Sequence, residues 1–213
     1  MKKPKATDIL IGILFTLFII SLGVIATVNF RSLYYFDIDY LNIANDSGIS
    51  KEIIIDNYNA LIDYNSPFFQ GDLKLPDLSS SLDGLQHFVD VKNIFTTFYY
   101  IAGITLILCG TIIIYKKVKK DYSYLLVSSI AVLLIPAMAA IASIINFDAT
   151  FVVFHKIFFR NDFWLFDPST DPVITILPDT FFLHSLIFLI SFVFIGSLIL
   201  FLISRYLKKR EIK

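Results

Sequence analysis

The chain has very few residues of the kinds that form disulfides or thiol sites. It contains one cysteine, one tryptophan, two methionines and three histidines among 213 residues. A single cysteine excludes an intramolecular disulfide, and Cys109 falls inside a long apolar run where it is a poor candidate for a nucleophile. The sequence also lacks the Gly-x-Ser-x-Gly motif of serine hydrolases and the His-Glu-x-x-His motif of zinc proteases. Stability must therefore come from the packing of helices.

The chain also lacks a net charge, with 18 basic and 18 acidic residues, but 56% of its residues are hydrophobic. Its mean hydropathy of +0.73 is too high for an ordinary soluble domain. Four apolar runs, residues 9–30, 94–115, 124–145 and 181–204, are each long enough to cross about 30 Å of hydrocarbon. Only Pro136 interrupts them, and we expect it to kink its helix without breaking it. The sequence predicts an all-α membrane protein with four transmembrane helices, forming one polytopic domain over residues 1–213.

Basic residues are unevenly distributed along the chain. The N-terminal segment, the short loop between the second and third runs, and the C-terminal tail carry 12 of the 18 basic residues and three acidic ones. The loops 31–92 and 146–180 carry 6 basic and 15 acidic residues. Because cytoplasmic segments collect lysine and arginine, both termini are predicted to be cytoplasmic and both long loops extracellular. The basic residues of the three cytoplasmic segments are Lys2, Lys3, Lys5, Lys116, Lys117, Lys119, Lys120, Arg205, Lys208, Lys209, Arg210 and Lys213.

Each long loop contains a pattern typical of a short amphipathic helix at the membrane interface. In residues 51–64 of the first loop the apolar side chains recur at helical spacing, and this face packs either against the protein or against lipid or substrate. In the second loop four phenylalanines form a stripe that is typical of a helix lying in the interface. The residues of the two patterns are Ile54, Tyr58, Leu61, Ile62, Phe147, Phe151, Phe154 and Phe158.

The three histidines, His87, His155 and His184, all lie on the extracellular side of this topology. Histidine exchanges protons near neutral pH, so this clustering indicates acid or base chemistry at a membrane surface. Helical pattern resumes at Leu82 and runs into the second span, so it places both Asp83 and Asp90 on the same helix face as His87, where one of them could orient the ring. A histidine at an interface can also serve only as a polar anchor.

A dense polar loop, RNDFWLFDPSTDP, follows the second histidine of the chain, His155. Asn161 and Asp162 favour a turn, and prolines after Asp167 and Asp171 force extended backbone. Turn formation explains some of these residues, and an interfacial Trp164 is a common anchor. Turn formation and anchoring explain less well why so many polar groups flank a histidine at one membrane face.

Three functional classes are compatible with these residues. Histidines and carboxylates without an obvious protein nucleophile suit acyl, phosphoryl or peptidyl transfer in which the substrate supplies the nucleophile. A zinc-dependent lipid hydrolase would instead use the three histidines and an aspartate as ligands. A non-catalytic membrane transport subunit is the third class, and the absence of charged residues at mid-depth of the spans counts against it.

Two segments, LQHFVDVKNIF at 85–95 and FHKIFFRNDFWLFDPSTDPVITILPDTFF at 154–182, resemble the lipoprotein intramolecular transacylase (Lit) family of Gram-positive bacteria. The four-span frame with two long outer loops is similar to that family over nearly the whole chain. Phe88 stands where the family pattern has methionine, and His184 has no counterpart in the pattern. The matching positions are His87, Asp90, Val91, His155, Phe158, Phe159, Asn161, Asp162, Trp164, Asp167, Pro168, Asp171 and Pro178.

The resemblance implies a specific reaction on diacylated lipoproteins at the membrane. The sn-2 acyl chain of a diacylglyceryl-cysteine would move to the α-amino group of that cysteine, which gives an N-acyl, S-monoacylglyceryl lipoprotein. No cofactor and no metal is implied, and no nucleic acid is a partner.

The resemblance also implies roles for the matching residues. His87, oriented by Asp90, would take the proton from the amine, and His155 would protonate the departing glycerol oxygen or hold the oxyanion, although the two roles could be exchanged. Three residues would fix the second histidine and shape the entrance, and two aspartates would stiffen the loop. These are Asn161, Asp162, Trp164, Asp167 and Asp171.

Overall fold

The computed structural model describes residues 5–212, and only the backbone of residues 211 and 212. Lys2, Lys3 and Lys213, which contributed to the predicted orientation, lie outside the described residues. The regular elements of the described part are all helical. They are α1 (Ala6–Asn29), α2 (Arg31–Tyr40), α3 (Ile43–Ser47), α4 (Lys51–Tyr64), α5 (Leu82–Val118), α6 (Ser123–Ile145), α7 (Phe147–Phe158), the 3₁₀ helix η1 (Pro172–Ile176) and α8 (Asp179–Ile212).

Four of these helices, α1, α5, α6 and α8, are long and apolar enough to cross a membrane. They contain the four predicted apolar runs apart from Phe30, which follows the last residue of α1, so the predicted all-helical, four-span fold is confirmed. Helix α5 begins at Leu82, as the renewed helical pattern predicted, and it extends well before the apolar run. Pro136 lies inside α6 and the helix continues through it, so the prediction that it would not break the span is also correct.

The chain forms two compact units. We call the first the span unit; it comprises the described residues of Met1–Ile25, Phe98–Ile141 and Phe188–Lys213. The second, the loop unit, comprises Ala26–Thr97 and Ala142–Ile187. All the histidines belong to the loop unit. The assignment of the whole chain to one membrane domain stays a prediction.

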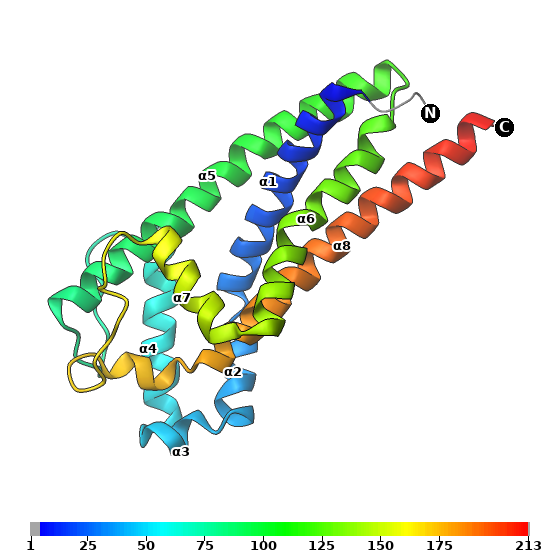
Figure 1. Cartoon of the computed structure of the whole chain (residues 1–213). Helices are drawn as coiled ribbons and strands as arrows, with labels where there is room; N and C mark the ends of the chain where they lie inside the picture. The colour runs from blue at the N-terminus through cyan, green and yellow to red at the C-terminus, as the bar shows by residue number, and fades with distance from the viewer. Residues whose placement is uncertain (1–4, 213) are drawn as a thin grey trace. The chain divides into compact units, whose positions relative to one another are not determined.

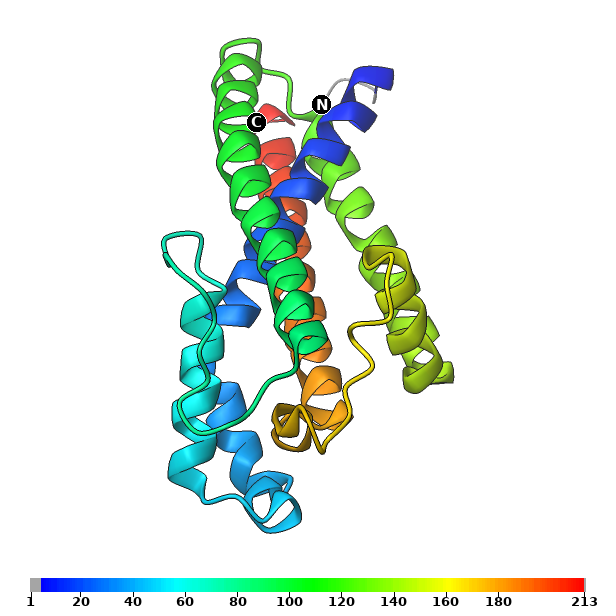
Figure 2. The ribbon, with the colours of Figure 1, turned by 90° about the vertical axis from the view of Figure 1, so that its left-hand side faces the viewer.

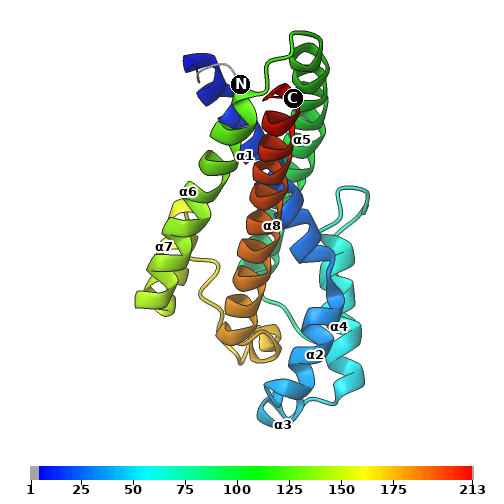
Figure 3. The same cartoon turned by 90° about the vertical axis from the view of Figure 1, so that its right-hand side faces the viewer.

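Small residues let the helices of the span unit approach one another closely (Figures 1 and 3). A Cβ atom on Gly23 of α1 would lie 2.7 Å from Leu189 of α8, and one on Gly196 of α8 would lie 2.9 Å from Ile19 of α1. Helices in lipid associate through such close packing, because lipid provides little hydrophobic force to join them. These glycines therefore bring α1 against α8 directly.

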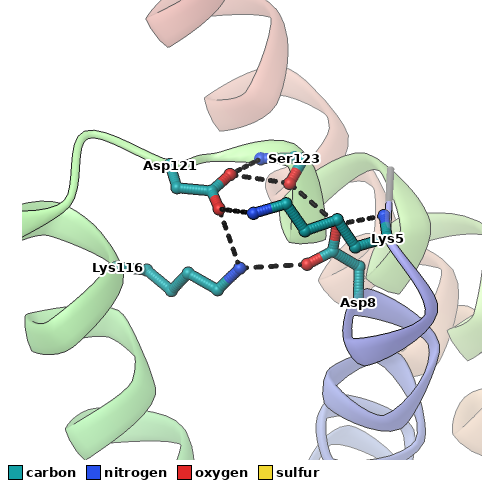
Figure 4. Close-up of polar contacts among 5 residues, drawn as sticks. All are labelled: Lys5, Asp8, Lys116, Asp121 and Ser123. Carbon is teal, nitrogen blue, oxygen red and sulfur yellow. Dashed lines mark hydrogen bonds and ion pairs between the residues drawn. The ribbon is translucent and has the colours of Figure 1, made fainter. Parts of the chain in front are cut away.

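A buried polar cluster joins three elements of the span unit (Figure 4). Lys116 of α5 donates to Asp8 of α1 at 3.0 Å and to Asp121 of the α5–α6 loop at 3.1 Å. The hydroxyl of Ser123, the first residue of α6, lies 2.8 Å from the Asp8 carboxylate and 2.7 Å from that of Asp121. Burial opposes the ionisation of Asp121, but hydrogen bonds from Ser123 and Lys116 outweigh it and hold its pKa well below the usual value. Lys5 adds a contact of 3.6 Å to Asp121.

The loop unit has its own aromatic core. Tyr34 of α2 is fully buried and stacks on Tyr58 of α4 with ring centroids 3.7 Å apart. Ile54 and Leu61, on the apolar face of α4, are buried in the same cluster, so the predicted amphipathic helix packs against the protein. That this helix and α7 lie in the membrane interface stays a prediction. Figure 2 shows residues 65–81 running from the end of α4 to the start of α5.

Replacement of Lys116 by methionine should destabilise the span unit. It would remove the buried cation from the carboxylates of Asp8 and Asp121 and leave Asp121 only its longer contact with Lys5. Removing one partner of a buried ion pair costs about 3–5 kcal/mol. The midpoint of thermal unfolding in detergent should fall by on the order of 10 °C. Lys117→Met is the matched control, because Lys117 is exposed and should change the midpoint little. Equal midpoints for the two variants would contradict the role of the cluster.

Candidate active site

Two histidines from distant parts of the sequence face one another in the loop unit. His87 lies on the second turn of α5 and His155 near the end of α7, with ring centroids 6.1 Å apart. The two side chains are buried, with exposed fractions of 6% and 8%. Two proton-exchanging groups at this separation can act on the same substrate bound between or beside them.

The ring of His155 is held in one tautomer by the backbone of its own helix. Its Nδ1 lies 2.8 Å from the carbonyl oxygen of Phe151, one turn earlier in α7. A carbonyl can only accept a hydrogen bond, so Nδ1 carries the hydrogen and Nε2 of the neutral ring is the acceptor. Burial lowers the pKa of His155 below its ordinary value, and the hydrogen bond to Phe151 opposes this only in part. At neutral pH the ring is therefore neutral, with Nε2 able to take a proton.

Aromatic rings enclose His155 on several sides. The indole of Trp164 stacks on the imidazole with centroids 4.7 Å apart and an angle of 29° between planes. Phe159 stacks at 5.5 Å and Phe151 lies at 4.2 Å. The indole Nε1 donates to the carbonyl oxygen of Asn161 at 3.1 Å, which fixes the ring that covers the histidine. The burial that lowers the pKa of His155 thus comes from the loop after α7 as well as from α7.

His87 lies among aromatic rings, and one of its two ring nitrogens has no hydrogen-bond partner among the described residues. Its ring centroid is 4.8 Å from that of Phe159 and 5.4 Å from that of Phe166. Its Nδ1 is buried and makes no hydrogen bond with any described residue. A buried polar atom without a partner costs about 1–3 kcal/mol, so such atoms are uncommon in folded proteins. This position suits an atom that becomes paired when a substrate binds.

The carboxylate of Asp90 accepts hydrogen bonds from residues other than His87. The spacing on the helix predicted that Asp90 would orient His87. In the structure its two oxygens accept from Gln86 Nε2 and from Asn161 Nδ2, each at 3.0 Å. No hydrogen bond joins Asp90 to His87 in the described part of the chain, because the loop after α7 brings an amide donor within reach of the carboxylate. Orientation of His87 by Asp90 stays a prediction. Asp90 instead links α5 to that loop.

Asn161 is the residue through which this loop is attached to the two histidine-bearing helices. Besides donating to Asp90, its side-chain oxygen accepts from the backbone N–H of Phe163 at 3.2 Å. Its carbonyl oxygen accepts from Trp164. Through its side-chain amide and its backbone carbonyl, Asn161 thus connects α5, the turn after α7 and the ring that covers His155.

The two aspartates that precede prolines have local structural partners. Asp167 accepts from the backbone N–H of Ser169 at 2.9 Å and from its hydroxyl at 2.7 Å. The buried Asp171 accepts from the backbone N–H of Ser81 at 2.7 Å and from Thr170 Oγ1 at 2.7 Å. These contacts stiffen the loop, and that of Asp171 joins it to Ser81, just before α5.

Two depressions lie beside the histidines in the loop unit. One, of about 210 Å³, is lined by Asp162, Phe166 and the start of α5. The other, of about 330 Å³, is more open and has Asp90 and Asn161 along its polar side and Phe159 along its apolar side. Since Phe159 and Phe166 are also the rings that contact His87, both depressions reach the wall of its pocket.

His184 has a partner of its own. Its Nδ1 lies 2.8 Å and 3.0 Å from the two carboxylate oxygens of Asp37 on α2.

In the part of the chain that the structure describes, no group of three or more histidine, cysteine, aspartate or glutamate side chains is placed to hold a metal ion. The three-histidine zinc arrangement weighed from the sequence is therefore not formed by these residues.

Several residues of the site could not be identified from the sequence. Phe159 and Phe166 form the walls around His87, but the chain contains 22 phenylalanines and nothing marks these two. Gly84 could have been noticed, because a glycine within a helical pattern often marks a position where another side chain packs closely against the helix. A Cβ atom there would overlap Asp171 Oδ1 and lie 3.1 Å from Phe166.

Comparison with known proteins gives one consistent result. Residues 9–182 match the family model of lipoprotein intramolecular transacylase Lit. The solved structure of the membrane integral lipoprotein intramolecular transacylase Lit from Bacillus cereus is 39% identical, with a TM-score of 0.92, and the match covers 96% of this chain and 97% of that chain. Forms of that protein with a histidine replaced by arginine or by alanine have TM-scores of 0.86 at 39% identity, and their matches cover 96% of this chain and 93% and 95% of theirs. No curated protein sequence matches the chain.

Alanine at Gly84 should destabilise the loop unit. The added methyl group would displace Asp171 from Ser81 or push Phe166 toward His87, and overpacking of this kind costs about 1–3 kcal/mol. The midpoint of thermal unfolding should fall. Gly103→Ala, farther along the same helix, is the control, because a Cβ atom there meets nothing within 4 Å. That change should be neutral or slightly stabilising, since alanine favours helix over glycine by about 0.5–1 kcal/mol. An equal effect at both positions would refute the close contact at Gly84.

Proposed function

The chain belongs to the lipoprotein intramolecular transacylase family and is an acyltransferase of the membrane, and we propose that His155 and His87 catalyse its reaction as general base and general acid. The family matches favour acyl transfer over the zinc hydrolase and the transport subunit that the sequence left open. The observation that carries the proposal is the pair of buried histidines, one with its tautomer set by the Phe151 carbonyl and the other with an unpartnered Nδ1.

The proposed reaction is an isomerisation within a diacylglyceryl-modified lipoprotein. The α-amino nitrogen of the lipidated cysteine attacks the carbonyl carbon of the sn-2 ester through an eight-membered ring. A C–N bond forms, the bond between the carbonyl carbon and the glycerol oxygen breaks, and one proton passes from nitrogen to that oxygen. Because both reactants are already tethered, the enzyme needs no acyl donor, only a site that holds the near-attack geometry.

His155 is the better candidate for the base. Its Nδ1–H is donated to Phe151, so its Nε2 presents a lone pair, and its lowered pKa keeps the ring neutral at the pH at which the amine must lose a proton. His87 then protonates the glycerol oxygen or holds the oxyanion, which would give its buried Nδ1 or the opposite nitrogen a partner. The proton that His155 takes from the amine replaces the one that the facing ring of His87 gives up, so both histidines end in the state in which they began. This assignment exchanges the roles first expected from the sequence.

The remaining site residues act on the histidines or on substrate access. Trp164 covers His155 and is fixed by Asn161, which Asp90 in turn holds. The exposed Asp162 lines the smaller depression and belongs to the entrance. Asp167 and Asp171 keep the loop in shape.

In this proposal the substrate is a diacylated lipoprotein in a bacterial cytoplasmic membrane, and the site works at the outer leaflet among membrane lipids. Both termini are cytoplasmic. The support is the distribution of charge: the segments at the termini and between α5 and α6 collect 12 of the 18 basic residues, and the long loops that hold the histidines collect 15 of the 18 acidic ones. The reaction as written requires no cofactor.

Alanine at His155 or at His87 should reduce product formation by about 10²- to 10⁴-fold without loss of expression, because each change removes one proton-transfer group. The measurement is tandem mass spectrometry of the N-terminal peptide of a diacylated reporter lipoprotein. Fragmentation is needed because the transfer leaves the intact mass unchanged. The expected product is an N-acyl cysteine carrying a monoacylglyceryl thioether.

Lys156→Ala is the matched control on α7, because this side chain is exposed beside His155 and should leave the product yield unchanged. A peptide that stays diacylated with a free amine in the presence of the wild-type protein would reject the proposed reaction. Full activity in both histidine variants would reject the catalytic assignment and leave the reaction standing.

The dependence of kcat on pH should report the lowered pKa of His155. Since the base must be neutral, activity is lost as the pH falls through its pKa, and burial places that midpoint below the ordinary value of about 6.5. Trp164→Ala would admit water to the ring, so the midpoint should rise toward about 6.5. A midpoint at or above 6.5 in the wild-type protein, or no difference between the two proteins, would argue against His155 as the base.

A further inference from the structure

Asp37 presents a fully buried carboxylate that the proposed chemistry does not use. Its side chain has an exposed fraction of 0%, and its two oxygens lie 2.8 Å and 3.0 Å from Nδ1 of His184. A carboxylate removed from water is strongly destabilising unless it is hydrogen-bonded. The pair therefore joins α2 firmly to the second turn of α8, both within the loop unit.

A chain of ring contacts leads from this part of α8 to the proposed base. Phe182 lies two residues before His184, and its ring centroid is 5.3 Å from that of Phe151. Phe151 lies 4.2 Å from the ring of His155 and supplies the carbonyl that holds the imidazole Nδ1–H. The first turn of α8 is thus the wall against which Phe151 rests.

Helix α2 supports that wall at a second point. Tyr34, three residues before Asp37 and on the same helix face, donates its hydroxyl hydrogen to the carbonyl oxygen of Ile176. Its ring meets the edge of Phe181 at 4.9 Å, and Phe181 packs against Phe182 at 5.4 Å. One face of α2 therefore positions both η1 and the start of α8.

We propose that Asp37 and His184 are positioning residues for the transacylation, acting through Phe182 and Phe151 to keep His155 in its Nδ1–H tautomer and out of water. The inference rests on the proposed function, in which His155 is the base. Loss of the pair releases the first turn of α8, so that Phe182 no longer presses on Phe151. His155 then becomes hydrated and loses its fixed orientation, while His87 and Asp90 on α5 remain in place.

The first test compares Asp37→Asn and His184→Ala with the wild-type protein in the reporter assay. Misplacement of a catalytic group by about 1 Å can cost on the order of 10²-fold in rate, so kcat should fall by about 10- to 100-fold. KM should stay within about twofold, and the acid-side midpoint of kcat should rise toward about 6.5 as His155 becomes hydrated. His184→Asn should restore much of kcat, because its amide can donate to Asp37.

Asp39→Asn is the matched control, since Asp39 lies on the same helix but is exposed, with its partner Lys51 at the surface. It should leave kcat, KM and the midpoint unchanged. If the pair served stability alone, the Asp37 and His184 variants would unfold at a lower temperature, but the pH at the acid-side midpoint of kcat would not change. That result, or an unchanged kcat, would overturn the positioning role.

The second test reads the tautomer of His155 without relying on activity. With three histidines in the chain, ¹⁵N-histidine nuclear magnetic resonance spectra can be assigned from single variants. The neutral Nδ1–H signature of His155 should be present in the wild-type protein and become averaged between tautomers in His184→Ala. Phe182→Leu leaves the Asp37–His184 pair intact and should give the same averaging, which keeps the test valid if His184→Ala fails to fold. An unchanged His155 signal in these variants would overturn the inference, whereas a wild-type protein that forms no N-acyl product would overturn the proposed function instead.

Discussion

The structure depends most on one constraint, namely that a polar atom removed from water must have a partner. In the span unit this explains why Lys116 bridges Asp8 and Asp121, and in the loop unit why Asp37 holds His184. Four buried side-chain atoms among the described residues lack a hydrogen bond: Asn65 Oδ1, His87 Nδ1, Ser128 Oγ and Ser143 Oγ. Of these, only the histidine nitrogen can exchange a proton near neutral pH. The one unpaired atom that can exchange a proton therefore lies in the proposed active site.

The same constraint separates the roles of the two facing histidines. His155 satisfies its Nδ1 with a backbone carbonyl, which leaves a lone pair on the opposite nitrogen, and burial keeps the ring neutral. A carboxylate in place of that carbonyl would instead favour the imidazolium form. On α5 the carboxylate of Asp90, three residues after His87, accepts hydrogen bonds from Asn161 and Gln86. The site thus keeps its proposed base, His155, uncharged by burying it and pairing it with a carbonyl.

Sequence patterns predicted those parts of the fold that depend on composition and period. The apolar runs located the four spans, and the phenylalanine stripe located α7 with His155 at its edge. These patterns could not predict that Trp164 stacks on His155, because that contact depends on a hydrogen bond from Asn161 to Asp90 on another helix. Pairs such as Asp37 with His184 are separated by 147 residues, and no local spacing indicates them. Helix α2 was not predicted, because it is short and the tyrosine on its buried face, Tyr34, is also typical of a membrane interface.

The chemistry explains why aromatic rings surround these histidines where other active sites place carboxylates. Conversion of an ester to an amide is downhill, and the two reacting groups are already tethered, so the enzyme does not have to supply a driving force or a second substrate. The competing reaction is attack on the same ester carbonyl by water. Rings such as Trp164 and Phe159 exclude water, and this also lowers the pKa of the base so that it stays neutral. Because exclusion of water fails when these rings move apart, the residues that hold them in place matter as much to the reaction as those that exchange protons.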